Sequence, residues 1–591
     1  MNKIFNILGT AVVSVGMLAS CTLDAVSYTE KDSSNFPKTA DDANQALAAI
    51  YQNLNLVCAN PQMSFYYISM LASDDNLGGG GTNDKLMQAE DLLCNYQNDM
   101  LNQFWNDRYA GINRANALLE ATQNIELGSD SKNQIEGEAK FLRAFYYYEL
   151  ASQFGNVPLV TTSAAAQPVA STPEALWGQI LMDLRDAAQN MPAKHTTTNN
   201  AGHVDKYAAE AMLGRAWLFY TGFYCNGTDL AALTSTTYKP LTSVTLPDGT
   251  TLTKENVISY IDDCVNNSGY SLVPEYRNLW AYTNRCTVED SPLTAGKGLK
   301  WVEDDNAVNP ESMFAIKFNK LADWNTTIGY GNGYALHFGI RGGQDYANTF
   351  PFGQGWGAGP VAANLVSDWK NAEPDDPRLT ASVVNVKDLP KYTYGGWADF
   401  VQETDYYQMK QGPVTAKYQD KDGNTQYYPV FEMAMYGEDG WTNSNQMQTG
   451  NIHDLVLIRF ADVLLMQSEL KESVDGINKV RARAGLKPIT TYSLEALQRE
   501  RRWELAFEGT RWNDIRRWHI AAAALEKQTN TAVYYCGASG HKNTAHNGGY
   551  AARYNATAGF FKIPESQISL SNGGLKQNAG WTDASAEYTG W

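Results

Sequence analysis

The first residues whose types suggest chemistry are an acidic group ahead of a glycine run. Asp74, Asp75 and Asn76 come just before four consecutive glycines, Gly78 to Gly81. Such a run does not belong inside a helix, so the segment is predicted to be a loop. Carboxylate and amide oxygens suit a cation or the hydroxyl groups of a ligand. The alternative is a plain solvated turn.

Aromatic side chains form the second candidate group. The chain has 34 tyrosines and 15 tryptophans, which leaves a surplus for exposed stacking platforms. Flat rings suit the C–H faces of a sugar, while charged and amide side chains suit its hydroxyls. Any single tryptophan is more often buried, so the group supports a site and no one member does. The candidates are Trp280, Tyr282, Trp301, Trp324, Arg341, Asp345, Tyr346, Trp356 and Trp397.

No enzyme motif accompanies these residues. The sequence has no G-x-S-x-G, no H-E-x-x-H, no Walker loop and no pair of histidines four residues apart. Nothing in the sequence positions a carboxylate pair of the glycosidase kind. We therefore predict a binding protein that is not an enzyme, and an extracellular glycan-active hydrolase is the alternative from another class.

The elements that would position these residues are mainly helices. Glu136–Val160 leaves little polar face, which indicates a helix buried nearly all round. Lys206–Tyr224 is a second predicted buried helix, with small residues that allow close packing. Between residues 226 and 451 lies a long stretch rich in glycine, tyrosine, asparagine and aspartate. No clean tetratricopeptide period is visible, so periodicity alone does not identify the fold.

The segment Gln498–Trp518 is predicted to organise the helices. Glu500, Glu504 and Glu508 recur every four residues and would share one face of a helix that reaches Gly509. The arginines around them favour buried ion pairs that join several helices. A catalytic carboxylate cluster is the alternative, but glutamates among so many arginines are more often structural.

Five motifs together resemble the SusD/RagB family. The two N-terminal ones are Phe141–Ala144 and Phe154–Val160, and the C-terminal ones are Ile458–Glu469, Ile477–Gly485 and Gln498–Trp518. The resemblance implies a mainly α fold, a tetratricopeptide-like helical-repeat superhelix with a large loop-rich inserted subdomain. The predicted boundaries are a signal peptide at 1–20, an N-terminal helical scaffold at 21–225, the insert at 226–451, and C-terminal helices with an irregular tail at 452–591.

The resemblance also implies a function. It predicts a cell-surface lipoprotein that captures an oligosaccharide and delivers it to a SusC-type TonB-dependent outer-membrane transporter. In starch-binding relatives, the contacts come from the loop after the first helix and from the insert, which correspond here to Asp74–Asn76 and to aromatic residues such as Trp280 and Trp301. Peptide capture is the alternative within the family. No cofactor is expected, and the resemblance leaves calcium open.

The N-terminus reads as an export signal. Lys3 precedes a short apolar run, and Leu18-Ala19-Ser20 before Cys21 resembles a lipobox. Lipidation of Cys21 would anchor the protein to the outer membrane without a spanning segment. The other six cysteines form no recognisable framework, so disulfides and free thiols both remain open. The formal net charge of −18 argues against nucleic acid as a partner.

Replacing Cys21 tests the predicted anchor. The Cys21→Ala variant should lack the lipid and leave the membrane fraction, because the apolar run before it is too short to hold the chain in a bilayer. Fractionation of cells expressing either form measures this. Retention of the variant on membranes after a high-salt wash would rule the anchor out.

Overall fold

The computed structural model describes residues 36–93, 99–193, 202–319, 331–342, 345–396, 398–429, 431–437, 450–544 and 548–581. Its helices are α2 (Ala40–Leu56), α3 (Phe65–Leu71), α4 (Lys85–Glu90), α5 (Asn102–Ala121), α6 (Ser129–Phe154), α7 (Pro173–Asn190), α8 (Lys206–Phe223), α9 (Leu230–Leu233), α10 (Lys254–Asn267), α11 (Gly333–Phe338), α12 (Tyr346–Thr349), α13 (Ala363–Ala372), α14 (Pro377–Ser382), α15 (Phe431–Tyr436), α16 (Phe460–Lys471), α17 (Asp475–Arg483), α18 (Leu494–Glu504), α19 (Arg511–Arg517), α20 (Ala521–Glu526), α21 (Tyr550–Thr557) and α22 (Glu565–Leu570).

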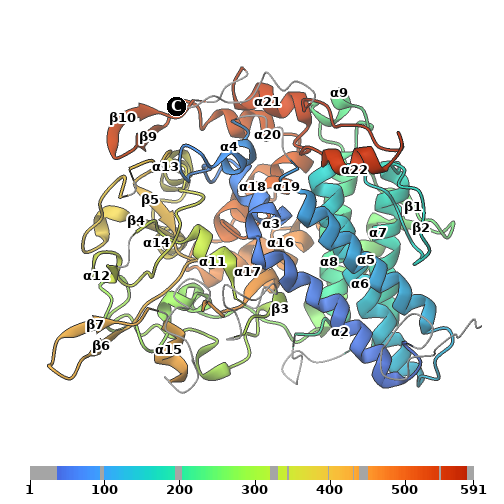
Figure 1. Ribbon diagram of the computed structural model, residues 1–591, viewed down its shortest axis with the longest axis horizontal. Coiled ribbons are helices and arrows are strands. Elements are labelled where there is room, and N and C mark those ends of the chain that lie inside the picture. The colour runs from blue at the N-terminus through green and yellow to red at the C-terminus, as the bar shows by residue number, and fades with distance from the viewer. Residues whose placement is uncertain are drawn as a thin grey trace, which may run out of the picture.

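The long helices pack one against the next along the chain. The series runs α2, α5, α6, α7, α8, α10, α16 and α17, and each helix contacts its successor. Figure 1 shows α5 to α8 on one side of the molecule and α16 to α19 at its centre. This arrangement confirms the mainly α, tetratricopeptide-like superhelix. Because α10 carries the series from α8 to α16, the helical scaffold extends past residue 225 into the segment predicted as the insert.

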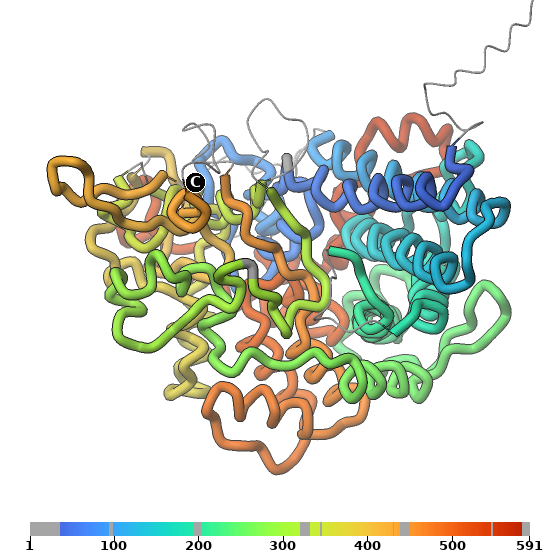
Figure 2. The backbone as a smooth tube through the Cα atoms, turned by 90° about the horizontal axis from the view of Figure 1, so that it is seen from below, coloured from blue at the N-terminus to red at the C-terminus, as the bar shows by residue number. Residues whose placement is uncertain are grey.

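The insert is built from short elements. Its strands and those of the flanking segments form five two-stranded antiparallel sheets. Of these, β3 pairs with β8, so residues 312–316 within the insert lie beside residues 455–459, just after its end. Figure 2 shows the insert beside the helices, with the β6–β7 hairpin projecting from it. The strands are β1 (Ser243–Thr245), β2 (Thr251–Thr253), β3 (Ser312–Ile316), β4 (Val383–Asn385), β5 (Tyr406–Gln408), β6 (Lys417–Gln419), β7 (Thr425–Tyr427), β8 (Leu455–Arg459), β9 (Ala532–Tyr535) and β10 (Ala538–Lys542).

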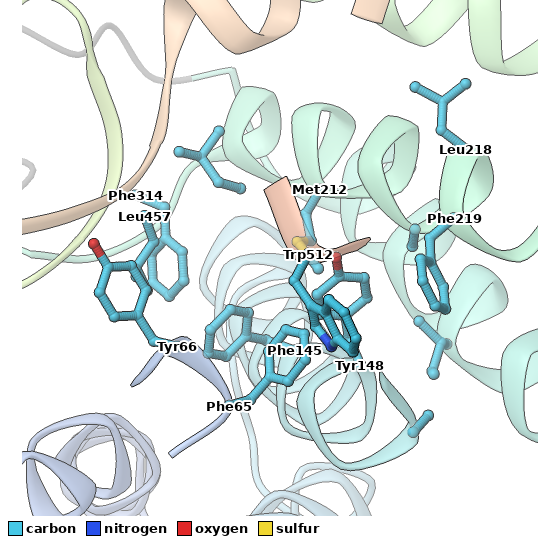
Figure 3. Close-up of a cluster of buried hydrophobic side chains, with 14 of the residues drawn as sticks. Phe65, Tyr66, Phe145, Tyr148, Met212, Leu218, Phe219, Phe314, Leu457 and Trp512 are labelled. Carbon is cyan, nitrogen blue, oxygen red and sulfur yellow. The ribbon is translucent and has the colours of Figure 1, made fainter. Parts of the chain in front are cut away.

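Two large hydrophobic cores stabilise the helical scaffold and the insert. The core of the scaffold gathers aromatic rings from several helices, including Phe65 of α3, Tyr148 of α6, Phe219 of α8 and Trp512 of α19 (Figure 3). The insert has its own smaller core. Among the described residues, no helix is long and apolar enough to cross a bilayer.

Buried ion pairs connect the scaffold to the insert. Glu504, at the end of α18, accepts hydrogen bonds from Arg378 at 3.0 Å, from Arg459 at 2.5 Å and from Arg483. Arg459 also contacts Glu311 at 2.7 Å. All of these side chains are at most 3% exposed. The predicted structural role of the glutamate–arginine pattern is therefore confirmed.

The predicted extent of this helix is wrong at its C-terminal end. α18 stops at Glu504 and does not reach Glu508, since its C-cap Leu505 leaves helical dihedrals (φ −102°, ψ 14°), and Phe507 (φ 64°) and Gly509 (φ 72°) then take left-handed conformations. Gly509 also allows close approach of Tyr66, whose ring lies 2.8 Å from where a Cβ would stand. Within this turn, the carboxylate of Glu508 accepts a hydrogen bond from Arg459 at 2.6 Å.

Removing the Glu504 carboxylate should destabilise the fold. The Glu504→Ala variant leaves three buried guanidinium groups short of a partner, and we expect a loss of about 3–5 kcal/mol in the free energy of unfolding. Denaturant titration measures it. The matched control is Lys471→Ala, since the Lys471–Asp262 pair is about one-third exposed and should contribute at most about 1 kcal/mol.

The same ion pairs make the stability of the fold depend on pH. Burial alone would raise the pKa of Glu504, but Arg483, Arg459 and Arg378 outweigh it and hold the pKa well below its usual value. A carboxylate with a lowered folded pKa contributes stability above its unfolded pKa of about 4.3 and loses it as the pH falls. Equal losses of stability below pH 4 in wild type and in Glu504→Ala would contradict this.

Candidate functional site

The loop after α3 interlocks with the insert. Backbone bridges join Asn76 to Val361, Gly79 to Ala358 and Gly81 to Phe400. A Cβ on Gly79 would stand 2.7 Å from the carbonyl oxygen of Gly357, and its φ is 70°. Only glycine fits this approach and this conformation without strain. The glycine run therefore serves to bring two backbone segments together.

The acidic group of this loop is buried beneath that junction. Asp74, Asp75 and Asn76 are each 1% exposed. Asp74 contacts Arg511 at 2.7 Å and Arg502 at 3.1 Å, and Asp75 contacts Arg502 at 2.7 Å. Asn76 donates to the carbonyl oxygen of Gly359 at 2.7 Å. These side chains are buried and contact Arg502, Arg511 and Gly359, so we leave them out of the proposed ligand surface.

The ionisation of Asp74 supports this assignment. Burial would raise the pKa of Asp74, but the charges of Arg502 and Arg511 outweigh it and hold the pKa well below its usual value. The carboxylate is therefore charged at neutral pH and bound to two guanidinium groups. It joins the loop to α18 and α19 in the way that Glu504 joins α18 to the insert.

Most of the aromatic candidates lie in the interior. Trp280, Tyr282, Trp301 and Tyr346 are at most 7% exposed. Trp280 faces the ammonium group of Lys410 at 4.9 Å, and Tyr282 donates to the carbonyl oxygen of Ala381 at 2.9 Å. Their contacts are those of core residues. Trp324 and Trp397 lie outside the described residues.

Trp356 and Arg341 remain near the surface, and both are half-buried. The indole of Trp356 packs on the ring of His337, with 4.6 Å between centroids. Arg341 donates to the carbonyl oxygen of Trp356 at 3.2 Å, and its guanidinium lies 4.4 Å from the ring centre of Phe400. Asp345 is exposed and accepts from Asn348 at 3.1 Å, within its own turn.

His337 packs against the indole of Trp356 and holds it in place. It is 4% exposed, and burial lowers its pKa to about 3, so the ring is neutral at pH 7. The hydroxyl of Tyr67 lies 3.4 Å from Nδ1 of His337 and 4.9 Å separates the rings of Tyr67 and Phe338. The indole of Trp356, which we call the platform, is thus held by α3 of the N-terminal helical part and by α11 of the insert.

Sequence reasoning missed the polar residues beside this platform. The backbone N–H of Thr82 donates to the carbonyl oxygen of Asp399 at 3.1 Å, and the carboxylate of Asp399 lies 3.8 Å from the guanidinium of Arg341. Asn83 is exposed, and the side chain of Asp399 is 56% exposed. No sequence signal joins residues 82 and 399, because only the bridge between Gly81 and Phe400 brings them together. We call Thr82, Asn83, Arg341, Trp356 and Asp399 the Trp356 surface.

This surface offers hydrogen bonding and stacking. Arg341 contacts the backbone of Trp356 and lies near Asp399, whose backbone pairs with Thr82, so a flat ring, a guanidinium, a carboxylate, a hydroxyl and an amide belong to one connected group of residues. Such groups suit a sugar. Within the part of the chain that the structure describes, no group of three or more histidine, cysteine, aspartate or glutamate side chains is arranged to hold a metal ion.

Comparison with known proteins gives the family context. The model of the SusD family matches residues 310–581, and a model described as "starch-binding associating with outer membrane" matches residues 24–218. SusD-like protein P2 of Formosa agariphila is 23% identical over 82% of this chain and 84% of its own length.

Solved structures with the same fold are also known. A laminarin-binding SusD-like protein is 22% identical, covers 92% of this chain and 99% of its own, and superposes with a TM-score of 0.64. Surface glycan-binding protein A from Bacteroides thetaiotaomicron, in complex with laminarihexaose, is 18% identical, covers 92% of this chain and 100% of its own, and gives a TM-score of 0.62. At these identities the likeness establishes the fold.

Variants of two aspartates test the placement of the site, because Asp74 should matter for stability and Asp399 for ligand binding. The Asp74→Asn variant should lose about 3 kcal/mol of stability, because it weakens a fully buried contact to two arginines. The affinity of its folded fraction for ligand should stay unchanged. Asp399→Asn is the matched control, and it should melt like wild type but bind ligand more weakly. Thermal melts and calorimetry measure the two effects, and the reverse pattern would contradict the placement.

Proposed function

Because the chain belongs to the SusD family, we propose that it is a cell-surface glycan-binding lipoprotein that captures an oligosaccharide and releases it unchanged. The observation that carries the proposal is the Trp356 surface. A half-buried indole packs on His337 and is connected through Arg341 and Asp399 to the loop that carries Thr82 and Asn83, and Asn83 and Asp399 are exposed. These are the two kinds of contact that a sugar ring needs.

The rigidity of this surface supports useful affinity. His337 and Arg341 hold the ring and the backbone of Trp356, so little side-chain entropy is lost when a sugar stacks on it. We expect micromolar binding, which corresponds to about −8 kcal/mol. Asp345, Trp324 and Trp397 remain further candidate contacts to the oligosaccharide.

A neutral oligosaccharide is the ligand class we favour. The chain carries a net charge of −18, which disfavours an anionic glycan. The relatives with this fold include one described as binding laminarin and one bound to laminarihexaose. We therefore take a neutral glucan oligosaccharide of the laminarin type as the first ligand to test.

We also propose that the protein works at the outer membrane with a SusC-type TonB-dependent transporter. The support is the family description, which places such proteins in association with the outer membrane, and the lipobox-like sequence at Cys21. Cross-linking on intact cells should trap the protein with a barrel of this type. Recovery of the protein alone from a membrane that contains the barrel would oppose the partnership.

Replacing the platform tests the binding function. Trp356→Ala should weaken glucan binding at least tenfold, about 1.4 kcal/mol, because it removes the stacking face. Isothermal calorimetry with laminarihexaose measures the change. Tyr418→Ala is the matched control, since Tyr418 is an aromatic of the insert that is 39% exposed on the separate β6–β7 hairpin, and its loss should leave affinity unchanged.

The same samples separate the alternatives. Chromatography of the recovered sugar should show intact hexaose, whereas shortened products in proportion to the protein would favour a hydrolase. Binding of peptides with no glycan bound would favour the peptide-capturing function. Unchanged glucan affinity in Trp356→Ala would move the site elsewhere on the molecule.

A further inference from the structure

The C-terminal tail lies against the insert beside the Trp356 surface. The backbone N–H of Tyr534, in β9, donates to the carbonyl oxygen of Glu403 at 2.8 Å, and that of Cys536 donates to the carbonyl oxygen of Phe400 at 2.8 Å. Phe400 also pairs with the glycine run of the loop after α3. The segment that carries Asp399 therefore pairs both with this loop and with β9. Figure 1 shows the β9–β10 hairpin over the insert, on the side of the molecule opposite α5 to α8.

Two tyrosine rings stack where this hairpin meets the insert. The ring centres of Tyr394 and Tyr534 are 3.8 Å apart, and their planes differ by 15°. Aromatic pairs prefer edge-to-face or offset arrangements with a wider spacing, so the surroundings impose this one. The backbones are in contact at the same place, since a Cβ on Gly537 would stand 2.9 Å from the carbonyl oxygen of Tyr394. The pairing of β9 with the insert thus brings the two rings together.

Asp405 holds both rings at their hydroxyl ends. One oxygen of its carboxylate accepts hydrogen bonds from the hydroxyl of Tyr394 and, at 3.3 Å, from that of Tyr534. Its second oxygen accepts from the ammonium group of Lys387 at 2.9 Å. Because both rings are held at the hydroxyl and through the backbone, a ligand that stacks on them would cost little side-chain entropy.

The stacked pair is partly open to solvent. Tyr394 and Tyr534 are half-buried, unlike Trp280 and Tyr282 of the insert core. The side chain of Lys387 is 62% exposed. Flat rings with a carboxylate and an ammonium group at their edge are again the groups that suit a sugar.

We propose that Tyr394 and Tyr534 form a second sugar platform, which continues the Trp356 surface and gives the protein a preference for longer neutral glucan oligosaccharides. The inference rests on the proposed glycan-binding function. Tyr394 is five residues from Asp399, so their Cα atoms lie within about 18 Å of each other. An extended oligosaccharide contacts both platforms, whereas a short one occupies Trp356 alone, because the indole is the larger flat face.

Glucans of two lengths test the second platform. Calorimetry on the purified full chain compares laminaritriose with laminarihexaose. Wild type should bind the hexaose about tenfold more tightly than the triose, and Tyr534→Ala should remove most of this difference. The affinity of Tyr534→Ala for the triose should equal that of wild type, because the triose does not reach the second platform.

Tyr535→Ala is the matched control. Tyr535 follows Tyr534 in β9, so its side chain points to the opposite face of the strand, and it is half-buried as well. This variant should bind the hexaose like wild type. Tyr534→Phe keeps the ring and should also retain the affinity for the hexaose. Thermal melts check that each variant is folded.

A measurement on the wild type makes the test independent of the variants. Hydrogen–deuterium exchange should show protection of β9 by the hexaose and none by the triose. Equal affinity of Tyr534→Ala and wild type for the hexaose, or no protection of β9, would overturn this inference. If Trp356→Ala still loses glucan affinity in that case, the proposed function stands without it. A wild type that binds neither glucan would overturn the proposed function, and this inference with it.

Discussion

The buried contact between Glu504 and three arginines is the constraint on which the rest of this structure depends. Arg378 comes from the insert, Arg459 from β8 and Arg483 from α17, and all of them converge on one carboxylate at the end of α18. Charges buried without partners cost several kcal/mol each, so the three segments are stable only when they meet. This requirement fixes the insert on the helical scaffold.

The position of the Trp356 surface follows from that constraint. Arg502 and Arg511, from the segment that begins with α18, hold Asp74 and Asp75 and thereby place the loop after α3. The glycines of this loop then bridge to the insert beside Trp356 and Asp399. The proposed ligand surface, which comes from two distant segments, is thus aligned by buried ion pairs. The carboxylates of Asp74 and Asp75, which the sequence predicts as ligand contacts, make these ion pairs.

The individual helices are predictable from sequence, because their strongest signals are local, whereas the superhelix is predicted only from the family resemblance. The glutamate–arginine pattern of Gln498–Trp518 and the apolar helices around Tyr148 and Phe219 determine their own secondary structure. The surface was less predictable, because whether an aromatic is exposed depends on what packs over it. Trp280 and Trp356 both come from the segment predicted as the insert, yet Trp280 lies in the insert core and Trp356 does not. Asp399 carries no sequence signal, because it is brought beside Thr82 by the backbone pairing of Phe400 with Gly81.

The most direct test of this account is hydrogen–deuterium exchange of the wild-type protein with and without laminarihexaose. The account predicts ligand-induced protection in the segments 79–83, 336–341, 354–358 and 398–402, which form and support the Trp356 surface. Segments 276–282 and 500–508, in the insert core and the ion-pair network, should exchange alike in both samples. Protection confined to other parts of the molecule, with none around Trp356, would contradict it.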